Sequence, residues 1–449
     1  MALYSLTEVL EATGGRLLLK GAETFTGISI DSRTIKENEL FIALKGERFD
    51  GHDFLEQALN KGSGSLVSIP PVIFYRGKSI IYVNNTLKAL QNIARYRRLS
   101  RKTRVIAVTG SNGKTTTKEM IARILSCRYT VLCNRGNLNN QIGLPLSLSE
   151  LDGQEMVVLE MGASRQGDID ELCQIALPNV GVITNIGPAH LEGFGSLQGV
   201  LDTKTELLRY VESLIINYDD PMLRTVPPER LKDKRIITFG IKHNAHIKAD
   251  CIEYGEKGID FSVHIKSKDS FKIHLPLYGL FNIYNALAAV AVGLLYDIPV
   301  EEMSRQLGSF KGVPMRVEIE TLKGAMVISD VYNANPVSME EALKELVRLK
   351  KRRAIAVLGD MLELGAYAEA AHREVGRLIA TLSVDVVIAV GSYMKYMKEE
   401  LNGKGSRIEF YHVDSPEEAK KILMNIIREG DTVLVKGSRG MNMERVLEA

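Results

Sequence analysis

The stretch VIAVTGSNGKTTTKEMIARIL, residues 105–125, joins an apolar run, a glycine-containing loop and a helix-compatible segment. This order is typical of a phosphate-binding loop in a parallel α/β sheet. Glycines let backbone N–H groups turn toward phosphate oxygens, and the helix N-terminus adds partial positive charge. The Gly-Lys-Thr end of the motif is present at residues 113–115, but Val108 stands where the first glycine is expected. The stretch therefore predicts an α/β nucleotide-binding domain with an unusual loop.

Two loop side chains have expected roles that follow from the motif itself. Lys114 would reach the terminal phosphates of a nucleotide, and Thr115 would give its hydroxyl to Mg²⁺. A turn that merely joins a strand to a helix is the alternative interpretation. We favour the phosphate site, because the context and three of the four key residues of the motif agree.

Length and composition indicate a multidomain globular protein. The 449 residues are too many for one ordinary core, so two to four domains are expected. Hydrophobic residues make up 45% and charged residues 25%, as in typical globular proteins. The formal net charge of +2 gives no reason to expect a nucleic-acid or membrane partner.

The same totals bear on the compartment. The four cysteines have no CxxC spacing, which argues against a disulfide framework or a zinc site and suits a reducing environment. The first residues lack the layout of a signal peptide, and no apolar run is long enough to span a bilayer. We therefore expect a cytoplasmic protein without a membrane span.

The hydrophobic pattern separates three blocks. Residues 1–100 mix short strand-like stretches with a helical segment that ends in a basic run. In residues 101–313 apolar runs alternate with helical segments, which indicates βαβ units around a parallel sheet. Period-2 stretches in residues 245–277 predict an antiparallel hairpin or ribbon. The alternation resumes in residues 314–449, so we expect an α/β fold with a second α/β domain there.

Glu160 is a candidate magnesium ligand, and His190 is a further candidate residue of the same site. Glu160 directly follows an apolar run, and His190 lies in a Gly/Pro-rich loop after the next one. Catalytic loops gather at the carboxyl ends of parallel strands, so Thr115, Glu160 and His190 should lie on one rim. An ordinary strand end and a loop histidine without function are the alternatives.

Lys204 does not fit its surroundings. It falls within an apolar stripe at helical spacing that includes Val200, Leu201 and Leu208. An unpaired buried ammonium is unfavourable, so Lys204 should snorkel to the surface, form an ion pair or be chemically modified. On the pattern alone, snorkelling is the favoured interpretation.

Several motifs together resemble those of one family. The loop TGSNGKTTT is similar to the P-loop variant of the Mur ligases, which form amide bonds with ATP in peptidoglycan synthesis and also lack the first glycine. LEMG, NNQIGLP and NIGPAHLEGFGS belong to the same pattern. DSRTI, LFIALKGERFDGHDF, DVYNANPVS, LGDMLELG and VKGSRGMNME extend the resemblance over essentially the whole chain. The resemblance implies an N-terminal UDP-sugar-binding domain, a central parallel-sheet ATPase domain and a C-terminal Rossmann-like domain.

The resemblance also implies roles for individual residues. The expected ATP-binding residues are Gly110, Ser111, Asn112, Gly113, Lys114, Thr115, Thr116, Asn282, Arg316 and Asp330. Thr115, Glu160 and His190 would bind Mg²⁺, and the catalytic residues would be Lys114, His190 and Lys204. The expected substrate-binding residues are Ser32, Arg33, Lys45, Gly46, Asn139, Asn140, Tyr332, Asn333 and Asn335. Lys204 matches a lysine that is carbamylated in several Mur ligases, where a carbamate could hold a second Mg²⁺ or orient a water.

One departure from the family concerns the nucleotide. The family often has Gly-x-His-Asn before the helix that contacts ATP, whereas Phe281 stands here at the histidine position. Asn282 and Asn285 are retained, so the resemblance carries over to Asn282 and leaves position 281 open. We expect the adenine or ribose contact to differ accordingly.

The implied reaction joins D-alanyl-D-alanine to UDP-N-acetylmuramoyl-tripeptide. ATP would phosphorylate the tripeptide carboxylate, and the dipeptide amine would attack the acyl phosphate. We expect ATP and Mg²⁺ as cofactors, a monomer, and domain closure about a hinge at residues 310–316.

The nearest alternative is the sister ligase that adds the third amino acid. Its diaminopimelate-adding form has an Asp-Asn-Pro-Arg motif, which is absent here, whereas YNANP is present. Folylpolyglutamate synthase is a weaker one, because it shares the ATP loop but not the UDP-sugar domain. A P-loop switch ATPase or GTPase is the alternative from another class. Against it, the chain lacks an Asn/Thr-Lys-x-Asp guanine-reading motif.

Overall fold

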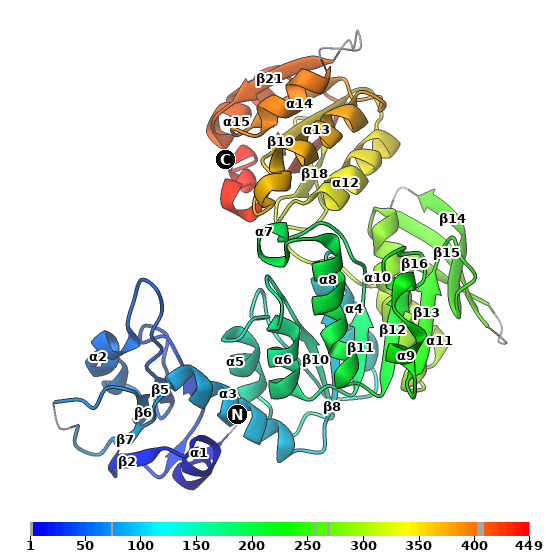
Figure 1. Cartoon of the computed structure of the whole chain (residues 1–449). Coiled ribbons are helices and arrows are strands. Elements are labelled where there is room, and N and C mark those ends of the chain that lie inside the picture. Colours follow the sequence, from blue (N-terminus) through cyan, green and yellow to red (C-terminus); the bar gives the residue numbers. More distant parts are fainter. Residues whose placement is uncertain (1–2, 73–74, 256, 267–269, 402–407, 449) are drawn as a thin grey trace.

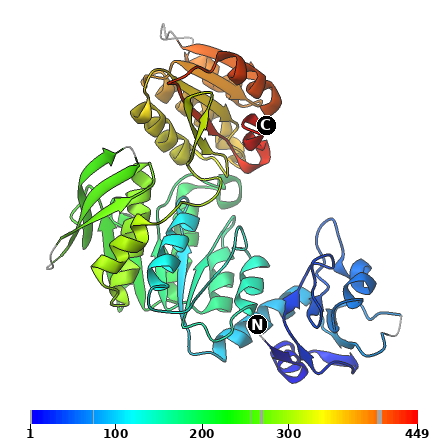
Figure 2. The ribbon, with the colours of Figure 1, turned by 180° about the vertical axis from the view of Figure 1, so that it is seen from behind.

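The computed structural model describes residues 3–72, 75–255, 257–266, 270–401 and 408–448. Its strands form three large sheets, each built from one continuous part of the chain. In the views from both sides the body that contains the second sheet lies between the other two (Figures 1 and 2). Among the described residues, no helix is long and apolar enough to cross a bilayer.

The N-terminal domain contains a five-stranded sheet in the order β2-β7-β6-β5-β4, parallel except between β2 and β7. Its strands are β2 (Arg16–Leu19), β4 (Ile28–Ser29), β5 (Leu40–Ile42), β6 (Gly64–Val67) and β7 (Ser79–Tyr82). A small separate pair is formed by β1 (Tyr4–Ser5) and β3 (Thr24–Phe25). The helices are α1 (Leu6–Thr13), η1 (Gly51–Phe54), α2 (Leu55–Leu59) and α3 (Thr86–Leu99).

The central domain is built on a nine-stranded sheet in the order β16-β15-β14-β13-β12-β11-β8-β10-β9. Its strands are β8 (Arg104–Thr109), β9 (Val131–Cys133), β10 (Met156–Glu160), β11 (Val180–Ile183), β12 (Ser213–Asn217), β13 (Arg235–Gly240), β14 (Ile247–Gly255), β15 (Gly258–Ile265) and β16 (Phe271–Leu275). The strands from β9 to β14 in this order are parallel, and β14-β15-β16 form an antiparallel ribbon, as the period-2 pattern predicted.

Helices cover both faces of the central sheet, because successive side chains of its strands point to opposite sides. In β8, Ile106 and Val108 pack in one apolar cluster, while Val105 and Ala107 pack in another on the opposite face. The α-helices are α4 (Lys114–Leu125), α5 (Gly143–Ser149), α6 (Asp168–Ala176), α7 (Leu191–Phe194), α8 (Leu197–Lys204), α9 (Pro228–Leu231), α10 (Leu280–Leu295) and α11 (Val300–Gly308). The 3-10 helices are η2 (Thr205–Arg209) and η3 (Leu223–Thr225).

Helix α3 attaches the N-terminal domain to the central one. The buried Gln91 donates from Nε2 to Oε1 of Glu171 on α6 at 2.8 Å. Arg97, 3% exposed, donates from Nε to the carbonyl of Leu151 at 2.8 Å. These bonds tie the helix firmly to the central domain, since buried polar groups are unfavourable without partners.

The C-terminal domain has a six-stranded sheet in the order β17-β18-β22-β19-β20-β21, parallel except between β17 and β18. Its strands are β17 (Glu318–Leu322), β18 (Ala325–Asp330), β19 (Ala354–Gly359), β20 (Val386–Val390), β21 (Glu409–Val413) and β22 (Thr432–Lys436). The helices are α12 (Pro336–Leu349), η4 (Gly365–Tyr367), α13 (Ala368–Ile379), α14 (Met394–Leu401), α15 (Pro416–Ile426), η5 (Arg439–Met441) and η6 (Met443–Val446). The sequence pattern missed β17, an edge strand that carries glutamates.

The segment between α11 and β17 connects the central and C-terminal domains. Met315 and Val317 adopt left-handed backbone there, with φ of 64° and 51°. Both values are unfavourable for residues with a side chain, most of all for β-branched valine. The predicted hinge at residues 310–316 therefore overlaps a strained segment, although its role in domain motion stays a prediction.

Candidate active site

The loop after β8 turns back on itself through two glycines. Gly110 has φ of 147° and Gly113 has φ of 78°, where it precedes the first residue of α4. A Cβ atom at Gly110 would lie 1.9 Å from Oγ1 of Thr184, and one at Gly113 would lie 2.3 Å from Oδ1 of Asn285. Val108 is a fully buried strand residue. The turn thus needs its glycines at 110 and 113, and position 108 has no part in it.

Asn185 holds the loop in shape from the neighbouring strand. Its carbonyl accepts the Ser111 N–H at 3.0 Å, and its Oδ1 accepts the Asn112 N–H at 2.9 Å. Its Nδ2 donates to the carbonyl of Asn112 at 3.1 Å, and the Ser111 hydroxyl donates to the carbonyl of Gly187 at 2.9 Å. Sequence reasoning missed Asn185, although it begins the quoted motif NIGPAHLEGFGS.

Lys114 lies over its own loop. Its Nζ donates to the carbonyls of Gly110 at 3.0 Å and Ser111 at 3.2 Å. Burial lowers the pKa of Lys114; the Glu160 carboxylate opposes this effect and Arg316 adds to it. The ammonium is therefore close to charged groups of two domains and within reach of anything bound in the loop.

Thr115 is bound by a residue of the C-terminal domain. Arg316 donates from Nη2 to Oγ1 of Thr115 at 2.9 Å. The guanidinium also lies 4.1 Å from the ring centroid of Tyr332, which is a cation–π distance. The structure thus places three of the predicted ligand-binding residues in direct contact across the domain boundary.

A second contact across the boundary joins two amides. Asn335 donates from Nδ2 to Oδ1 of Asn112 at 2.7 Å, and Asn112 donates back from Nδ2 to Oδ1 of Asn335 at 3.3 Å. Asn335 also caps α12, because its Oδ1 accepts the Ser338 N–H at 3.0 Å. One side chain therefore fixes both the start of a helix and the position of the phosphate loop.

Glu160 ends β10 and is 3% exposed. Its Oε1 accepts from Nδ2 of Asn139 at 2.7 Å, whereas its buried Oε2 has no hydrogen-bond partner among the residues that the structure describes. A buried carboxylate oxygen without a partner is unfavourable and points to a missing cation or donor. Asn139, a predicted substrate residue, is thus a direct neighbour of the predicted metal ligand.

His190 faces the C-terminal domain. Its Nδ1 lies 2.7 Å from Oε2 of Glu363, in the LGDMLELG motif. The hydrogen bond from His190 lowers the pKa of the Glu363 carboxyl. Both residues have left-handed backbone, with φ of 52° and 62°, so each is held in a restricted geometry.

Lys204 is the last residue of α8, at the point where the helix changes to η2, rather than in the middle of a longer helix. It is 3% exposed, and its ammonium makes no hydrogen bond or ion pair to the described residues; Phe194 lies with its ring centroid 5.7 Å from Nζ. Burial lowers the pKa of Lys204 well below its ordinary value, and Lys114 adds to the effect. The snorkelling that the pattern favoured is therefore wrong.

The strand order brings the predicted metal ligands to one edge. Parallel strands β10 and β11 flank β8, so Thr115, Glu160 and His190 all follow the carboxyl ends of adjacent strands. Within the described part of the chain, no three His, Cys, Asp or Glu side chains form a preassembled metal site.

Asn282 reaches the loop only through a neighbour. It is 4% exposed and donates to the carbonyl of Tyr278 at 2.7 Å, while Asn285 donates to its Oδ1 at 3.1 Å. Asn285 in turn accepts from the hydroxyl of Thr117 at 3.1 Å. Phe281 is half-buried and folds back against Gly279, where an added Cβ would lie 2.3 Å from its ring.

Asp330 pairs with a residue that sequence reasoning did not single out. Lys436, 1% exposed, donates from Nζ to Oδ2 of Asp330 at 2.5 Å and to the carbonyl of Asn333 at 2.9 Å. It lies in the quoted motif VKGSRGMNME. Lys436 therefore fixes the loop between β18 and α12, which carries Tyr332 and Asn335.

The other predicted substrate residues before the P-loop and beside Asn139 have local partners or are exposed. Ser32 donates to Oε1 of Gln57 at 2.8 Å, and the exposed Arg33 pairs with Asp31. Lys45 and Gly46 are exposed in the loop before η1. Asn140 accepts the Gly143 N–H at 2.9 Å, so its Oδ1 supports the start of α5. Their predicted roles in substrate binding stay predictions.

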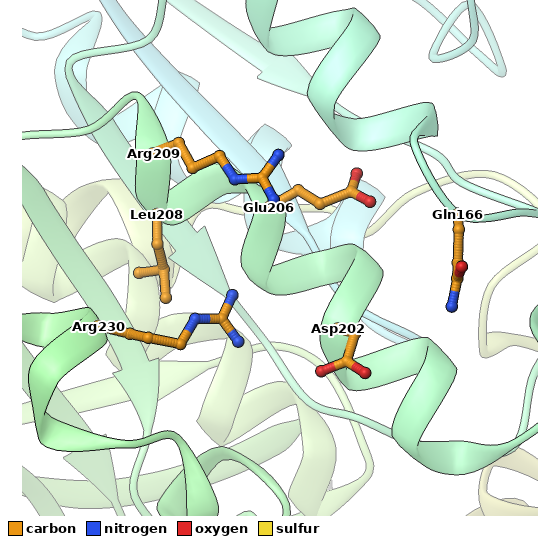
Figure 3. Close-up of a pocket in the computed structure, with 6 residues that line it drawn as sticks. All are labelled: Gln166, Asp202, Glu206, Leu208, Arg209 and Arg230. Atoms are coloured by element: carbon orange, nitrogen blue, oxygen red, sulfur yellow. The ribbon is translucent and has the colours of Figure 1, made fainter.

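A surface pocket near α8 is distinct from this site. It has a volume of about 500 Å³ and is lined by Gln166, Asp202, Glu206, Leu208, Arg209 and Arg230 (Figure 3). Glu206 accepts the Gly167 N–H at 2.8 Å, and Arg209 pairs with Asp170 at 3.0 Å. Arg230 donates to Oγ1 of Thr205 at 2.9 Å. The charged groups are thus largely engaged in joining helices.

A P-loop that is hydrogen-bonded to a second α/β domain, beside a third small domain, defines a three-domain protein of the P-loop class. Three family models match successive parts of the chain: "Mur ligase family, catalytic domain" at residues 24–98, "Mur ligase middle domain" at 108–293 and "Mur ligase, glutamate ligase domain" at 315–439. The chain belongs to the Mur ligase family.

Known relatives match over nearly their whole length. The UDP-N-acetylmuramoyl-tripeptide–D-alanyl-D-alanine ligase of Bacillus subtilis (strain 168) is 37% identical over 437 residues, covering 94% of this chain and 92% of that protein. The ligase of the same name from Escherichia coli (strain K12) is 34% identical, covering 100% and 98%.

Solved structures of related proteins match the fold of nearly the whole chain. A crystal structure of MurF from Acinetobacter baumannii has a TM-score of 0.91 at 33% identity, covering 99% of this chain and 98% of that one. MurF from Thermotoga maritima in complex with ADP has a TM-score of 0.83 at 32% identity, covering 94% and 96%. The expected α/β fold of three domains is confirmed.

Proposed function

We propose that this chain is an ATP-dependent ligase that joins D-alanyl-D-alanine to UDP-N-acetylmuramoyl-tripeptide for peptidoglycan synthesis. The observation that carries the proposal is the joining of the phosphate loop to the C-terminal domain, Thr115 to Arg316 and Asn112 to Asn335. A switch ATPase has no need of a second domain bound to its phosphate loop. The names of the relatives from Bacillus subtilis and Escherichia coli supply the substrates.

The chain's own residues can position and neutralise the phosphates. Backbone N–H groups at residues 110–116 and the α4 N-terminus would hold ATP, while Lys114 and Arg316 would offset charge on the transferred γ-phosphate. The tripeptide carboxylate attacks that phosphate, ADP leaves, and the dipeptide amine then attacks the acyl phosphate and releases inorganic phosphate. Such chemistry needs positioning and charge neutralisation more than a protein nucleophile.

The residues present fit Mg²⁺. The buried Oε2 of Glu160, which has no partner among the described residues, and the hydroxyl of Thr115 are oxygen ligands of the kind that Mg²⁺ prefers, and His190 is a third candidate. When bound, Mg²⁺ would neutralise phosphate charge in the transition state. Glu363 holds Nδ1 of His190, which leaves Nε2 as the ring nitrogen that would face the ion, and Arg316 would share the Thr115 hydroxyl with it.

Lys204 fits a carbamate better than an ammonium. The amine is buried and unpaired among the described residues, and its lowered pKa leaves the neutral, nucleophilic form available. Addition of that amine to CO₂ forms the carbamate and releases a proton. The resulting anion would lie near Lys114, whose charge now disfavours the Lys204 ammonium.

The remaining predicted residues would bind the substrates. Ser32, Arg33, Lys45 and Gly46 would hold the UDP-sugar, and the loop of Tyr332, Asn333 and Asn335 would contact ATP and the dipeptide. Asn139 and Asn140 would face the muramoyl peptide. The protein would act as a monomer in the cytoplasm, where its substrates are made.

The test is a two-substrate ligation assay with ATP and Mg²⁺. One reaction contains UDP-N-acetylmuramoyl-tripeptide and D-alanyl-D-alanine; the other contains the corresponding dipeptide precursor and a single amino acid. We expect phosphate release and a pentapeptide-mass product in the first reaction alone. Product in the second alone would establish the sister ligase, and ATP hydrolysis indifferent to both would support a switch ATPase.

A further inference from the structure

Lys118 lies one helical turn beyond Lys114 on α4 and is fully buried. Its Nζ donates a hydrogen bond to the carbonyl of Asn134, at the end of β9, and lies 2.8 Å from Oε1 of the neighbouring Glu119. A buried ammonium is strongly unfavourable unless it is paired and hydrogen-bonded. An apolar residue would fill the same place in the core without that penalty, so the charge calls for another explanation.

Asn134 is also fully buried, and its side chain forms hydrogen bonds with the end of β10. Its Oδ1 accepts the Glu160 N–H at 2.9 Å, and its Nδ2 donates to the Glu160 carbonyl at 3.0 Å. The same Nδ2 donates to the carbonyl of Leu138 at 2.8 Å. One amide therefore fixes both backbone groups of Glu160 and the loop that leads to Asn139.

The network closes on the Glu160 carboxylate. Asn139 follows Leu138 directly and donates to Oε1 of Glu160 at 2.7 Å, while the buried Oε2 has no partner in the described part of the chain. A Cβ atom on Gly162 would lie 2.9 Å from Oδ1 of Asn139, so the approach is tight. Backbone and side chain of Glu160 are thus held by residues that Lys118 anchors to the P-loop helix.

We infer that Lys118 and Asn134 are positioning residues that set the Glu160 carboxylate relative to the phosphate loop, so that its free oxygen can bind a divalent cation. The inference rests on the metal role proposed above for Glu160. Lys118 fixes Asn134 to α4, and Asn134 fixes Glu160 and, through Leu138, Asn139. The phosphate site on α4 and the cation site on β10 then move as one unit.

The test is Lys118→Met, which keeps the length of the side chain and removes its charge. Binding of Mn²⁺ in the presence of ADP is followed by the electron paramagnetic resonance of free Mn²⁺, and ADP binding without metal is measured separately. We expect Mn²⁺ affinity to fall about tenfold, as when outer partners of a metal ligand are lost. Metal-free ADP affinity should stay within about twofold, because the loop N–H groups are untouched.

Matched variants separate positioning from stability. Ile121→Ala removes a fully buried apolar side chain from the same helix and should leave Mn²⁺ affinity unchanged. Asn134→Ser removes the amide but keeps the carbonyl that Lys118 binds, and should also lower Mn²⁺ affinity about tenfold. It serves in place of Lys118→Met if that variant does not fold.

Glu160→Gln shows which idea fails. If Glu160→Gln weakens Mn²⁺ binding while Lys118→Met and Asn134→Ser do not, the positioning inference alone is overturned. The positioning inference is also overturned if Ile121→Ala loses as much Mn²⁺ affinity as Lys118→Met. The same holds if Lys118→Met loses as much metal-free ADP affinity as Mn²⁺ affinity. If Glu160→Gln binds Mn²⁺ as the wild type does, the metal role of Glu160 falls, and this inference falls with it.

Discussion

Arg316 and Thr115 lie 201 residues apart in the chain, yet the guanidinium of one donates to the hydroxyl of the other at 2.9 Å. The Thr115 hydroxyl, the proposed magnesium ligand of the P-loop, therefore accepts a hydrogen bond from a cation of the neighbouring domain. Arg316 also stacks on Tyr332, so the loop after β18 and the P-loop are linked through one side chain. Arg316 therefore lies where it can contact both the P-loop and a nucleotide bound in it.

Arg316→Ala should lower kcat for ligation about 10²-fold, because it removes a positioned charge at the phosphates. Arg316→Lys should restore little of it, since lysine lacks the planar fork and stacks poorly on Tyr332. Steady-state phosphate release with both substrates measures the effect. Arg305→Ala, which removes an exposed arginine paired with Glu302, is the control. A kcat for Arg316→Ala within threefold of wild type would contradict its proposed role.

Asn335→Ser should separate the two tasks of that residue. Serine is also a good helix cap, so α12 should stay stable, but its shorter side chain cannot reach Asn112. We expect the apparent affinity for ATP to fall, by roughly the 0.5–1.5 kcal/mol of a net hydrogen bond. A double-mutant cycle with Asn112→Ala measures the coupling. Strict additivity of the two substitutions would show that the amide pair contributes nothing.

Lys204→Met should raise the melting temperature in CO₂-free buffer while abolishing ligation. Burial without a partner costs about 1–3 kcal/mol, and methionine removes that penalty. The folded state of the wild type binds the Lys204 proton more weakly than the unfolded state, because the pKa is lowered by burial and by Lys114. Wild-type stability therefore falls as the pH falls from the ordinary lysine range through that lowered pKa.

The advantage of Lys204→Met should accordingly be large at neutral pH and shrink toward pH 10. Thermal melts across this range check the trend, and each kcal/mol corresponds to about 2–4 °C in a domain of this size. Added bicarbonate should stabilise the wild type alone, since only it can form the carbamate. A Lys204→Met protein that melts below the wild type at pH 7 would mean that the amine has an unrecognised partner.

Glu363→Gln should loosen the contact between the central and C-terminal domains. The His190 hydrogen bond lowers the pKa of Glu363, so this contact is fully present above the ordinary glutamate range and is lost as the pH falls through the lowered value. Limited proteolysis of the segment between α11 and β17 at neutral pH measures the loosening. At neutral pH we expect the protease to cleave Glu363→Gln faster than the wild type. The difference between the two cleavage rates should narrow in acid, where Glu363 of the wild type is protonated. Equal rates at neutral pH would show that the ion pair does not hold the domains together.

The parts of the fold with strong local signals were predictable from sequence. The strand, loop and helix around Gly113 are set by glycines that must adopt positive φ, and the ribbon of β14, β15 and β16 follows a period of two. Strand β17 was missed because three of its five residues, Glu318, Glu320 and Thr321, are polar. An edge strand tolerates such residues, so its sequence carries little hydrophobic signal.

In the candidate site, the sequence predicted only residues whose motif or place after a strand marks them. Glu160 and His190 follow strand ends, and strand order alone brings them to one edge. Asn185, Lys436 and Lys118 were missed, because each acts through a partner distant in sequence that only the folded chain reveals. The favoured interpretation of Lys204 as a snorkelling side chain was wrong because the folded chain encloses the ammonium, and a local apolar pattern does not report that packing.

Met315 and Val317 place strained backbone in the connection between the central and C-terminal domains. Each left-handed residue stores about 1–2 kcal/mol that the extended or right-handed form would release. If the chain turns at the predicted hinge, relaxation of these two residues would offset part of the free energy needed to reorient the C-terminal domain. Glycine at either position would remove that strain, because it adopts positive φ readily. The substitution would thereby shift the balance between domain arrangements without altering any group that touches a ligand.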